Sequence, residues 1–414
     1  MDSLRQSLTG LSHQYTRPAG HPQLVKLLAE RYEQHLNQEV DPMKNVAVTV
    51  GASQALFLAL TTLLAKGDEI IMFDPFFELY TKQISLTGAV PKFVTLGGEA
   101  ATLENPWALD IAALRKAVTS KTRVLLLNSP HNPTGKVFTK AEMEAIAEIV
   151  RENPELTVVS DEVYKFTVYD PQESGDPTST GHHHFSRLPG MWDRTVTISS
   201  AGKTFSVTGW QVGWMVGPEK FINPVQALLP CVQFCAATPI QEALCTAIRR
   251  AEQPYEGYAT YYEWLRSQFS SKRQILEEGL RAAGMEPIRS NGGVFLMARL
   301  PDDAELMQQW QQEKQAAKMD ATTAATAAAG SDAFIEPYDW RYCRKLAAEH
   351  RVIGIPASPF FSNPEEAPPL ARFAFCKTDD TLIEAARRLK TKTPTVGQIN
   401  TQQNPSISAG SLRN

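Results

Sequence analysis

Short apolar stretches alternate along the chain with stretches of helical spacing. The apolar stretches are rich in β-branched residues, and turn residues bound them: VAVTV (46–50), EIIMF (69–73), RVLLLN (123–128), LTVVSD (156–161) and TVTISS (195–200). Between them lie helical segments such as 141–150, where Thr139 can cap the first turn. Strands that alternate with helices are typical of a mostly parallel sheet flanked by helices, so the pattern predicts an α/β fold.

The C-terminal part of the chain has a different pattern. An amphipathic helix (SKRQILEEGLRAAG) precedes a strand (GGVFLMARL), as at the start of a smaller α+β domain. We expect a large domain over 1–268, with a short lead-in over 1–13, and a small C-terminal domain over 269–392.

Two segments of the C-terminal part contain few apolar side chains that a core could bury. Residues 311–333 are rich in Ala, Thr and Gln, which predicts an inserted surface loop or a frayed helix. Residues 393–414 contain few apolar or charged groups, so we expect a disordered tail.

Charge and cysteine content narrow the classes of partner. Lys and Arg number 41 against 45 Asp and Glu, a net charge of -4, so no basic field would attract nucleic acid or anionic lipid. The uncharged run 46–65 contains polar residues and a Gly, which favours a strand followed by a helix over a membrane span. Five cysteines and no apolar leader predict a reducing, cytoplasmic location.

Polar residues stand where the predicted strands end, the edge at which parallel sheets bind ligands. The turn 51–53 opens a helix whose free amides can hold a phosphate, although other strand-to-helix turns look similar. Asn132 lies in an Asn-Pro-Thr-Gly turn, and Asp161 ends an apolar strand, where a carboxylate needs solvent or a cation. Lys203 follows the last strand among small and hydroxylic residues, a setting that suits an amine nucleophile or a structural Lys.

Taken together, these residues match one cofactor. An amine for a Schiff base, a carboxylate for a ring nitrogen, donors for a phenolate and a helix start for a phosphate are what pyridoxal 5'-phosphate (PLP) requires. The pattern therefore predicts a PLP site.

The sequence resembles the class I aminotransferases of PLP fold type I, and within them the kynurenine aminotransferase/cysteine-S-conjugate β-lyase group. The resemblance runs from about Tyr15 to about Leu389 and rests on ordered motifs: QYTRPAGHPQL, TVGASQALF, DPFFELY, NSPHNPTGKVF, SDEVY, LPGMWDRTVTISSAGKTFSVTGWQVGW, ATPIQEAL and ARFAFCK. It implies a homodimer that moves the amino group of an L-amino acid to a 2-oxo acid through pyridoxamine phosphate. Aromatic, kynurenine-like or glutamine donors are expected.

The resemblance also implies roles for individual residues around the cofactor ring. Lys203 would form the Schiff base and carry the proton between substrate Cα and the cofactor. Asp161 would keep the pyridine nitrogen protonated, and Asn132 and Tyr164 would hydrogen-bond the phenolate oxygen. Phe77 would stack on the ring.

Further residues would hold the phosphate and the substrate. The amides of Ala52 and Ser53, the hydroxyl of Ser200 and a Tyr15 from the second subunit would bind the phosphate. Arg372 would clamp the substrate carboxylate with its two-pronged guanidinium.

The chain departs from the family pattern at two places. Gln211 stands where the family has Lys or Arg, so we expect weaker phosphate binding. Family members also begin several tens of residues earlier, which predicts a short form or a more open pocket.

Two other functions are compatible with these residues. One is β-elimination from cysteine S-conjugates on the same cofactor, and the other is a catalytically silent dimeric homologue. The three histidines 182–184 lie in a hydrophilic stretch and predict a solvated loop without a metal.

Overall fold

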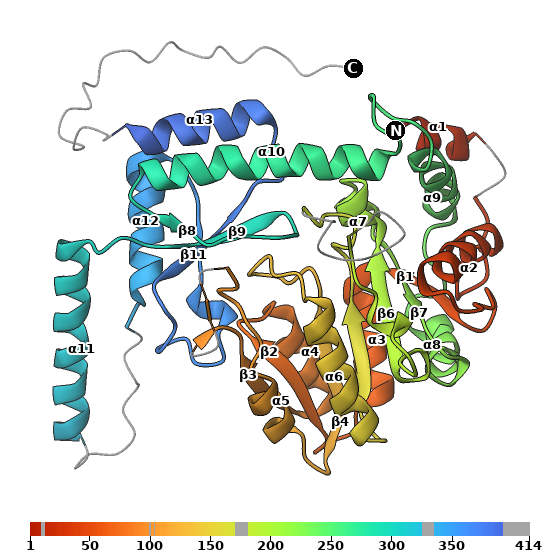
Figure 1. The fold of residues 1–414 in the computed structure, drawn as a ribbon, viewed down its shortest axis with the longest axis horizontal. Helices are drawn as coiled ribbons and strands as arrows, with labels where there is room; N and C mark the ends of the chain where they lie inside the picture. The colour runs from red at the N-terminus through yellow and green to blue at the C-terminus, as the bar shows by residue number, and fades with distance from the viewer. Residues whose placement is uncertain (10–12, 99–100, 103, 170–180, 325–334, 392–414) are drawn as a thin grey trace, which may run out of the picture.

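The protein contains a seven-stranded sheet with helices on both faces and a second, four-stranded sheet packed against its own helices (Figure 1). The computed structural model describes residues 1–9, 13–98, 101–102, 104–169, 181–324 and 335–391, with the side chains of 317–324 left aside.

The large sheet has the strand order β1-β7-β6-β5-β4-β2-β3. Strand β7 pairs antiparallel with both neighbours, and all other pairs are parallel, so six strands point their carboxyl ends to one edge. The strands are β1 (Val46–Val50), β2 (Glu69–Asp74), β3 (Val90–Thr95), β4 (Thr122–Asn128), β5 (Thr157–Asp161), β6 (Thr195–Ser200) and β7 (Val212–Val216).

Helices bury the apolar residues on both faces of this sheet. One core lies between the sheet and α5 and α6, another beneath α3, α4 and α8, and a third beneath α2 and α9. The helices of this part are α1 (Asp2–Leu8), α2 (Pro22–Leu36), α3 (Gly51–Leu63), α4 (Leu79–Thr87), α5 (Ile111–Ala117), α6 (Lys140–Glu152), the short α7 (Ala201–Thr204), α8 (Glu219–Val232) and α9 (Thr238–Ala251).

The small sheet is antiparallel, in the order β10-β11-β9-β8, and packs with α10, α12 and α13 around its own core. Helices α10 and α13 run side by side across it (Figure 1). The elements are α10 (Tyr261–Ala282), β8 (Glu286–Pro287), β9 (Phe295–Arg299), α11 (Ala304–Ala324), α12 (Tyr338–His350), β10 (Ile355–Pro356), β11 (Leu370–Ala374) and α13 (Asp379–Lys390).

The predicted α/β fold with a mostly parallel sheet and a smaller C-terminal α+β unit is confirmed. The sequence boundary at 268/269 falls inside α10, whose buried residues from Leu265 onward join the small core. Within 311–333, residues 311–324 are helical, in line with the helix alternative. The rest of that stretch and the predicted tail lie outside the described residues.

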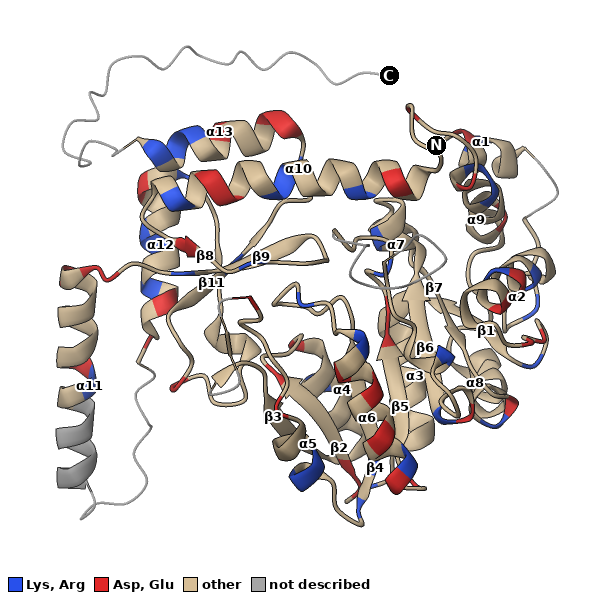
Figure 2. Cartoon of the chain, in the orientation of Figure 1, with Lys and Arg blue, Asp and Glu red and all other residues tan. Residues whose placement is uncertain are grey.

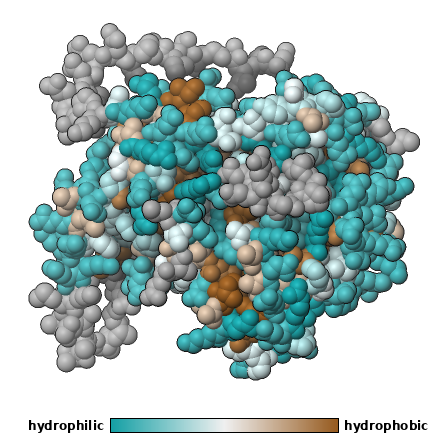
Figure 3. All heavy atoms as spheres, viewed as in Figure 1, coloured by the Kyte–Doolittle hydropathy of each residue, from teal (hydrophilic) through white to brown (hydrophobic). Residues whose placement is uncertain are grey.

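The surface carries both signs of charge. Figure 2 shows Lys and Arg interspersed with Asp and Glu on the outer helices, including α6, α10 and α13. The face in Figure 3 is mostly hydrophilic, with hydrophobic atoms showing where Figure 1 places β2 and α4. Among the described residues, no helix is long and apolar enough to cross a membrane.

Candidate active site

The carboxyl ends of β4, β5 and β6 meet beside the starts of two helices. The register pairs Asn128 with Asp161 and Asp161 with Ile198, so Asp161 lies between its two neighbouring strands. Helix α3 follows β1 directly, and α7, which carries Lys203, follows β6. A cavity of about 350 Å³ opens at this edge.

All the predicted site residues except Tyr15 line this cavity: Ala52, Ser53, Phe77, Asn132, Asp161, Tyr164, Ser200, Lys203, Gln211 and Arg372. The structure therefore brings together residues that lie up to 320 positions apart in the chain, from 52 to 372.

Asp161 is a buried carboxylate with two protein donors. The hydroxyl of Tyr80 donates to Oδ2 at 2.7 Å, and the backbone N–H of Val163 donates to Oδ1 at 3.3 Å. Burial raises the pKa of Asp161 to about 6, while the bond from Tyr80 opposes that rise. A cation placed against this carboxylate would relieve the cost of burying its charge.

Arg372 reaches the cavity from β11 of the small sheet. Its guanidinium lies 5.3 Å from the ring centre of Phe295 and 4.7 Å from that of Phe360, and one nitrogen donates to Oδ1 of Asn132 at 2.8 Å. Its Nε is buried without a hydrogen-bond partner among the described residues. A fixed guanidinium with unused donors is suited to bind a carboxylate.

Asn132 is held by the strand ends. Its backbone N–H donates to Oδ1 of Asn128 at 2.7 Å, and the Nδ2 of Asn128 donates to the carbonyl of Asp161 at 2.9 Å. Because Oδ1 of Asn132 already accepts from Arg372, its NH₂ group is left as a donor.

Lys203 and Tyr164 lie on neighbouring sides of the cavity. The Nζ of Lys203 is 5.7 Å from the ring centre of Tyr164, and that ring packs edge-on against Phe295 at 5.2 Å. Burial raises the pKa of Tyr164, so near neutral pH it is a phenol and can donate a hydrogen bond.

The first turn of α3 faces the cavity with free amides. No side chain caps this turn, so its first N–H groups are available to an anion. Gly213 of β7 passes directly behind it: a β-carbon there would overlap the backbone of Gly51 and lie 2.6 Å from the nitrogen of Ala52. The absence of a side chain at 213 lets α3 start beside the end of β6.

Gln211 lies beside this turn but presents an acceptor to it. Its Nε2 donates to the carbonyl of Thr208 at 2.5 Å, and a β-carbon on Gly51 would lie 2.6 Å from its Oε1. Among the residues that line the cavity, the only cations are Lys203 and Arg372.

Tyr15 does not reach the cavity of its own chain. Its side chain is 81% exposed, and its ring packs against Phe234, with ring centres 4.7 Å apart.

Sequence reasoning missed several cavity residues: Tyr80, Asn128, Thr208, Phe295 and Cys376. Asn128 ends a predicted strand, so the rule that located Asp161 could have found it. Tyr80 lies on α4 and carries no comparable local signal.

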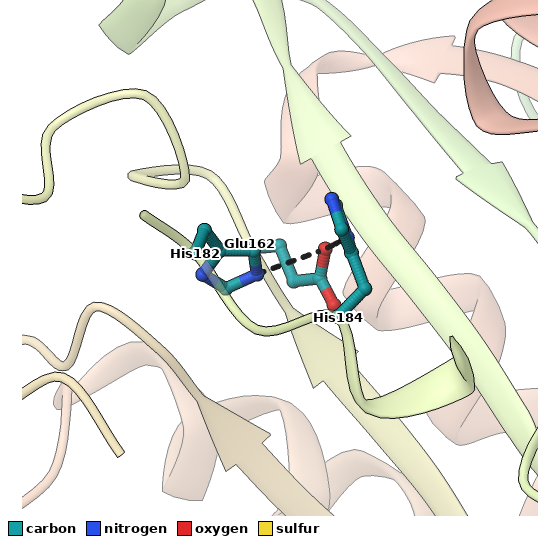
Figure 4. A group of neighbouring side chains, drawn as sticks. All are labelled: Glu162, His182 and His184. Atoms are coloured by element: carbon teal, nitrogen blue, oxygen red, sulfur yellow. Dashed lines mark hydrogen bonds and ion pairs between the residues drawn. The ribbon is translucent and has the colours of Figure 1, made fainter. Parts of the chain in front are cut away.

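The prediction of a solvated histidine loop is wrong. His182 and His184 are buried and contact the carboxylate of Glu162, as Figure 4 shows. The hydrophilic composition of the loop gave no sign of this, because the partner lies on a different segment.

A family model, "Aminotransferase class I and II", matches residues 2–389. The chain belongs to this family. It is an aminotransferase.

Relatives and solved structures share this assignment. The kynurenine–oxoglutarate transaminase of Dictyostelium discoideum is 38% identical over 385 residues, which cover 90% of this chain and 82% of the relative. Kynurenine–oxoglutarate transaminase 1 of Rattus norvegicus is 35% identical, with coverage of 94% and 87%.

Two solved aminotransferases show the same fold. N-succinyldiaminopimelate aminotransferase of Mycobacterium tuberculosis is 32% identical, with a TM-score of 0.77 and coverage of 94% and 88%. A methionine aminotransferase of Escherichia coli is 27% identical, with a TM-score of 0.76 and coverage of 94% and 89%. Because these two enzymes are named for different amino donors, the shared fold of the aminotransferases does not select the donor.

Proposed function

We propose that this aminotransferase binds PLP in the cavity and transfers the amino group of an aromatic, kynurenine-like L-amino acid to a 2-oxo acid. The observation that carries the proposal is that an amine (Lys203), a buried carboxylate (Asp161) and a guanidinium (Arg372) line one cavity beside an uncapped helix start.

The donor set of the cavity fits PLP. The raised pKa of Asp161 marks a carboxylate that a pyridinium would stabilise, and the amides of 51–53 with the hydroxyl of Ser200 suit a phosphate. Asn132 and Tyr164 supply donors for the phenolate oxygen, and Phe77 offers a ring face. When bound, PLP supplies an electron sink that makes the substrate Cα–H acidic.

The protein residues then have separate tasks. Arg372 binds the α-carboxylate of the amino acid, and its contacts with the rings of Phe295 and Phe360 restrict the direction of the guanidinium. Lys203 would take the proton from the substrate Cα and carry it to the cofactor. Asp161 holds the proton on the cofactor's ring nitrogen.

The substrate class is inferred from the cavity wall and the relatives. Phe295 lines the cavity next to Arg372, which places an aromatic ring beside the proposed carboxylate site and favours a flat apolar side chain. The curated relatives cited above carry kynurenine and oxoglutarate in their names, and we extend that pair to this chain as donor and acceptor.

We also propose that the enzyme works as a homodimer. Tyr15, Val50, Val232 and Phe234 are exposed hydrophobic residues close to the rim of the cavity, since Val50 immediately precedes the cavity residue Gly51. Gln233, between two of them, accepts from the backbone N–H of Val50 at 3.2 Å. A second copy covering this patch would bury it and could place its own Tyr15 at the phosphate.

A spectroscopic half-reaction tests the proposal. The PLP-loaded protein is mixed with single L-amino acids, and the absorbance change to the pyridoxamine form is recorded for wild type and Lys203→Ala. We expect conversion with kynurenine or another aromatic donor in wild type and none in the variant. Release of pyruvate from a cysteine S-conjugate without a 2-oxo acid would instead support β-elimination. Absence of conversion with every donor would refute the proposal.

A further inference from the structure

A second carboxylate follows Asp161 directly in the chain. Glu162 is fully buried, and its backbone N–H donates to the carbonyl of Ile198 at 2.8 Å, which extends the pairing of β5 with β6. Its side chain contacts His182 and His184 (Figure 4), and it is not among the residues that line the cavity. The two adjacent carboxylates therefore have different surroundings.

Three side chains hold the Glu162 carboxylate. Its Oε2 lies 2.5 Å from Nδ1 of His184 and 3.2 Å from Nε2 of His182, and its Oε1 accepts from the hydroxyl of Ser160 at 2.9 Å. All four residues are buried. A carboxylate with this many contacts has little freedom to rotate.

The surroundings keep this carboxylate ionised. Burial favours a higher pKa for Glu162, but the two imidazoles outweigh it and hold that pKa well below its usual range. Burial lowers the pKa of His184 to about 4, although Glu162 opposes this. The ionised carboxylate of Glu162 thus adds a second buried anion next to Asp161 in the chain.

Cationic and further titratable groups lie close by on α2 and after β5. Burial lowers the pKa of Lys165 to about 7, although Glu162 opposes this, and its Nζ lies 3.0 Å from the hydroxyl of Tyr32. His35 stacks on His184 with ring centres 5.2 Å apart, and burial lowers its pKa. Arg31 contributes a positive charge to the same region.

The distances favour hydrogen bonds over a metal ion in this cluster. Two ligands of a tetrahedral zinc, each about 2.0–2.1 Å from the ion, lie roughly 3.3 Å apart. The separation of 2.5 Å between Glu162 and His184 is too short for that geometry and is normal for a strong charge-assisted hydrogen bond.

The peptide that joins the two carboxylates is fixed as well. The carbonyl of Asp161 accepts from Nδ2 of Asn128 at 2.9 Å and from the backbone N–H of Ser129 at 3.1 Å. The carbonyl of Glu162 accepts from the backbone N–H of Lys165 at 3.1 Å. Asp161 and Glu162 therefore project from one fixed stretch of backbone, so that a shift of this backbone would move both carboxylates.

We infer that Glu162 is a positioning residue for Asp161. Clamped by His182 and His184, it fixes the end of β5 so that the Asp161 carboxylate points at the position proposed for the cofactor's ring nitrogen. This inference rests on the proposed PLP site.

The test compares two cofactors that differ at that nitrogen. Dissociation constants of PLP and of an analogue with carbon in place of the pyridine nitrogen are measured for wild type and Glu162→Gln. We expect Glu162→Gln to weaken PLP binding by about tenfold, the value of one hydrogen bond to a charged group, and to leave analogue binding unchanged. Equal weakening for both cofactors, or no weakening, would overturn the inference.

Controls separate positioning from general loss of stability. Glu69→Gln removes another buried carboxylate, 9% exposed against 0% for Glu162, at the start of β2, where it is bonded to Thr119, and should change neither cofactor's affinity. If Glu162→Gln folds poorly, the milder Ser160→Ala should show the same selective loss in smaller degree, and an unselective loss there would also overturn the inference.

Further outcomes distinguish this inference from the proposed function. A stoichiometric zinc ion in wild type that Glu162→Gln loses would overturn the hydrogen-bond assignment. Failure to bind PLP at all would overturn both proposals. Normal PLP binding without conversion of any amino acid would refute only the proposed function, and the comparison of the two cofactors would still decide the role of Glu162.

Discussion

Replacing Gln211 with Lys should tighten cofactor binding, because the proposed phosphate site lacks a cation of its own. Gln211 directs its Nε2 to Thr208 and its Oε1 toward the first turn of α3, so an acceptor stands where phosphate oxygens need donors. The two cations of the cavity, Lys203 and Arg372, are assigned to the cofactor's aldehyde and the substrate carboxylate.

The size of the effect follows from one new charge-assisted hydrogen bond. Such a bond contributes about 1.5–3 kcal/mol, which corresponds to roughly 10- to 150-fold in the dissociation constant. Gln211 has a left-handed backbone with φ of 51°. Lys is also unbranched at Cβ, so the substitution adds no backbone strain beyond what Gln already bears.

The assay is equilibrium binding to cofactor-free protein, with PLP and pyridoxal compared at two salt concentrations. Gln211→Lys should bind PLP more tightly and pyridoxal unchanged, because only PLP carries the phosphate. The gain should shrink at high salt. Equal gains for PLP and pyridoxal, or no gain for PLP, would refute the assignment of this turn to the phosphate.

Three further predictions concern the carboxylate, the guanidinium and the backbone of the site. Tyr80→Phe removes a donor that opposes the rise in the pKa of Asp161 caused by burial, so in the cofactor-free protein this carboxyl group should titrate about 1–2 pH units higher, as followed by NMR; an unchanged titration would contradict this role. Arg372→Lys should raise KM for the amino acid about 10- to 100-fold, because Lys cannot form the two parallel hydrogen bonds that Arg forms with a carboxylate. Steady-state kinetics measure this change, and a thermal melt should show little change in folding. Gly213→Ala should lower the free energy of unfolding by about 1–3 kcal/mol and weaken PLP binding. Gly209→Ala, where a β-carbon meets open space, should change neither quantity. Equal effects of the two substitutions would show that close packing at 213 is not the cause.

The local pattern of apolar and turn residues was sufficient to predict the strands that carry the site. The predicted ranges 46–50 and 195–200 match β1 and β6, and Thr139 caps α6 through a capping box with Glu142, as its sequence suggests. The position of Lys203 and Asp161 at strand ends therefore followed from residue type and spacing.

Two strands of the large sheet were not predicted from the sequence, for different physical reasons. β3 contains Pro91 and lies at the sheet edge, the position where a strand tolerates a residue without an N–H. β7 is a short apolar run with Gly213 in its middle, and nothing local says that it inserts antiparallel between β1 and β6. Cytoplasmic location, the homodimer and the individual site roles stay predictions.

The way the proposed phosphate site is assembled explains why its local signals were weak. Gly213 pairs with Thr49 on one side and with Ser200 on the other, so one residue of β7 separates the end of β1 from the end of β6. A side chain there would push the first turn of α3 away from Ser200, because its β-carbon would meet the backbone of that turn. The proposed anion site thus depends on the absence of a side chain at position 213. The sequence alone does not show why a glycine is needed there, because the reason appears only when the strand order places Gly213 between the ends of β1 and β6.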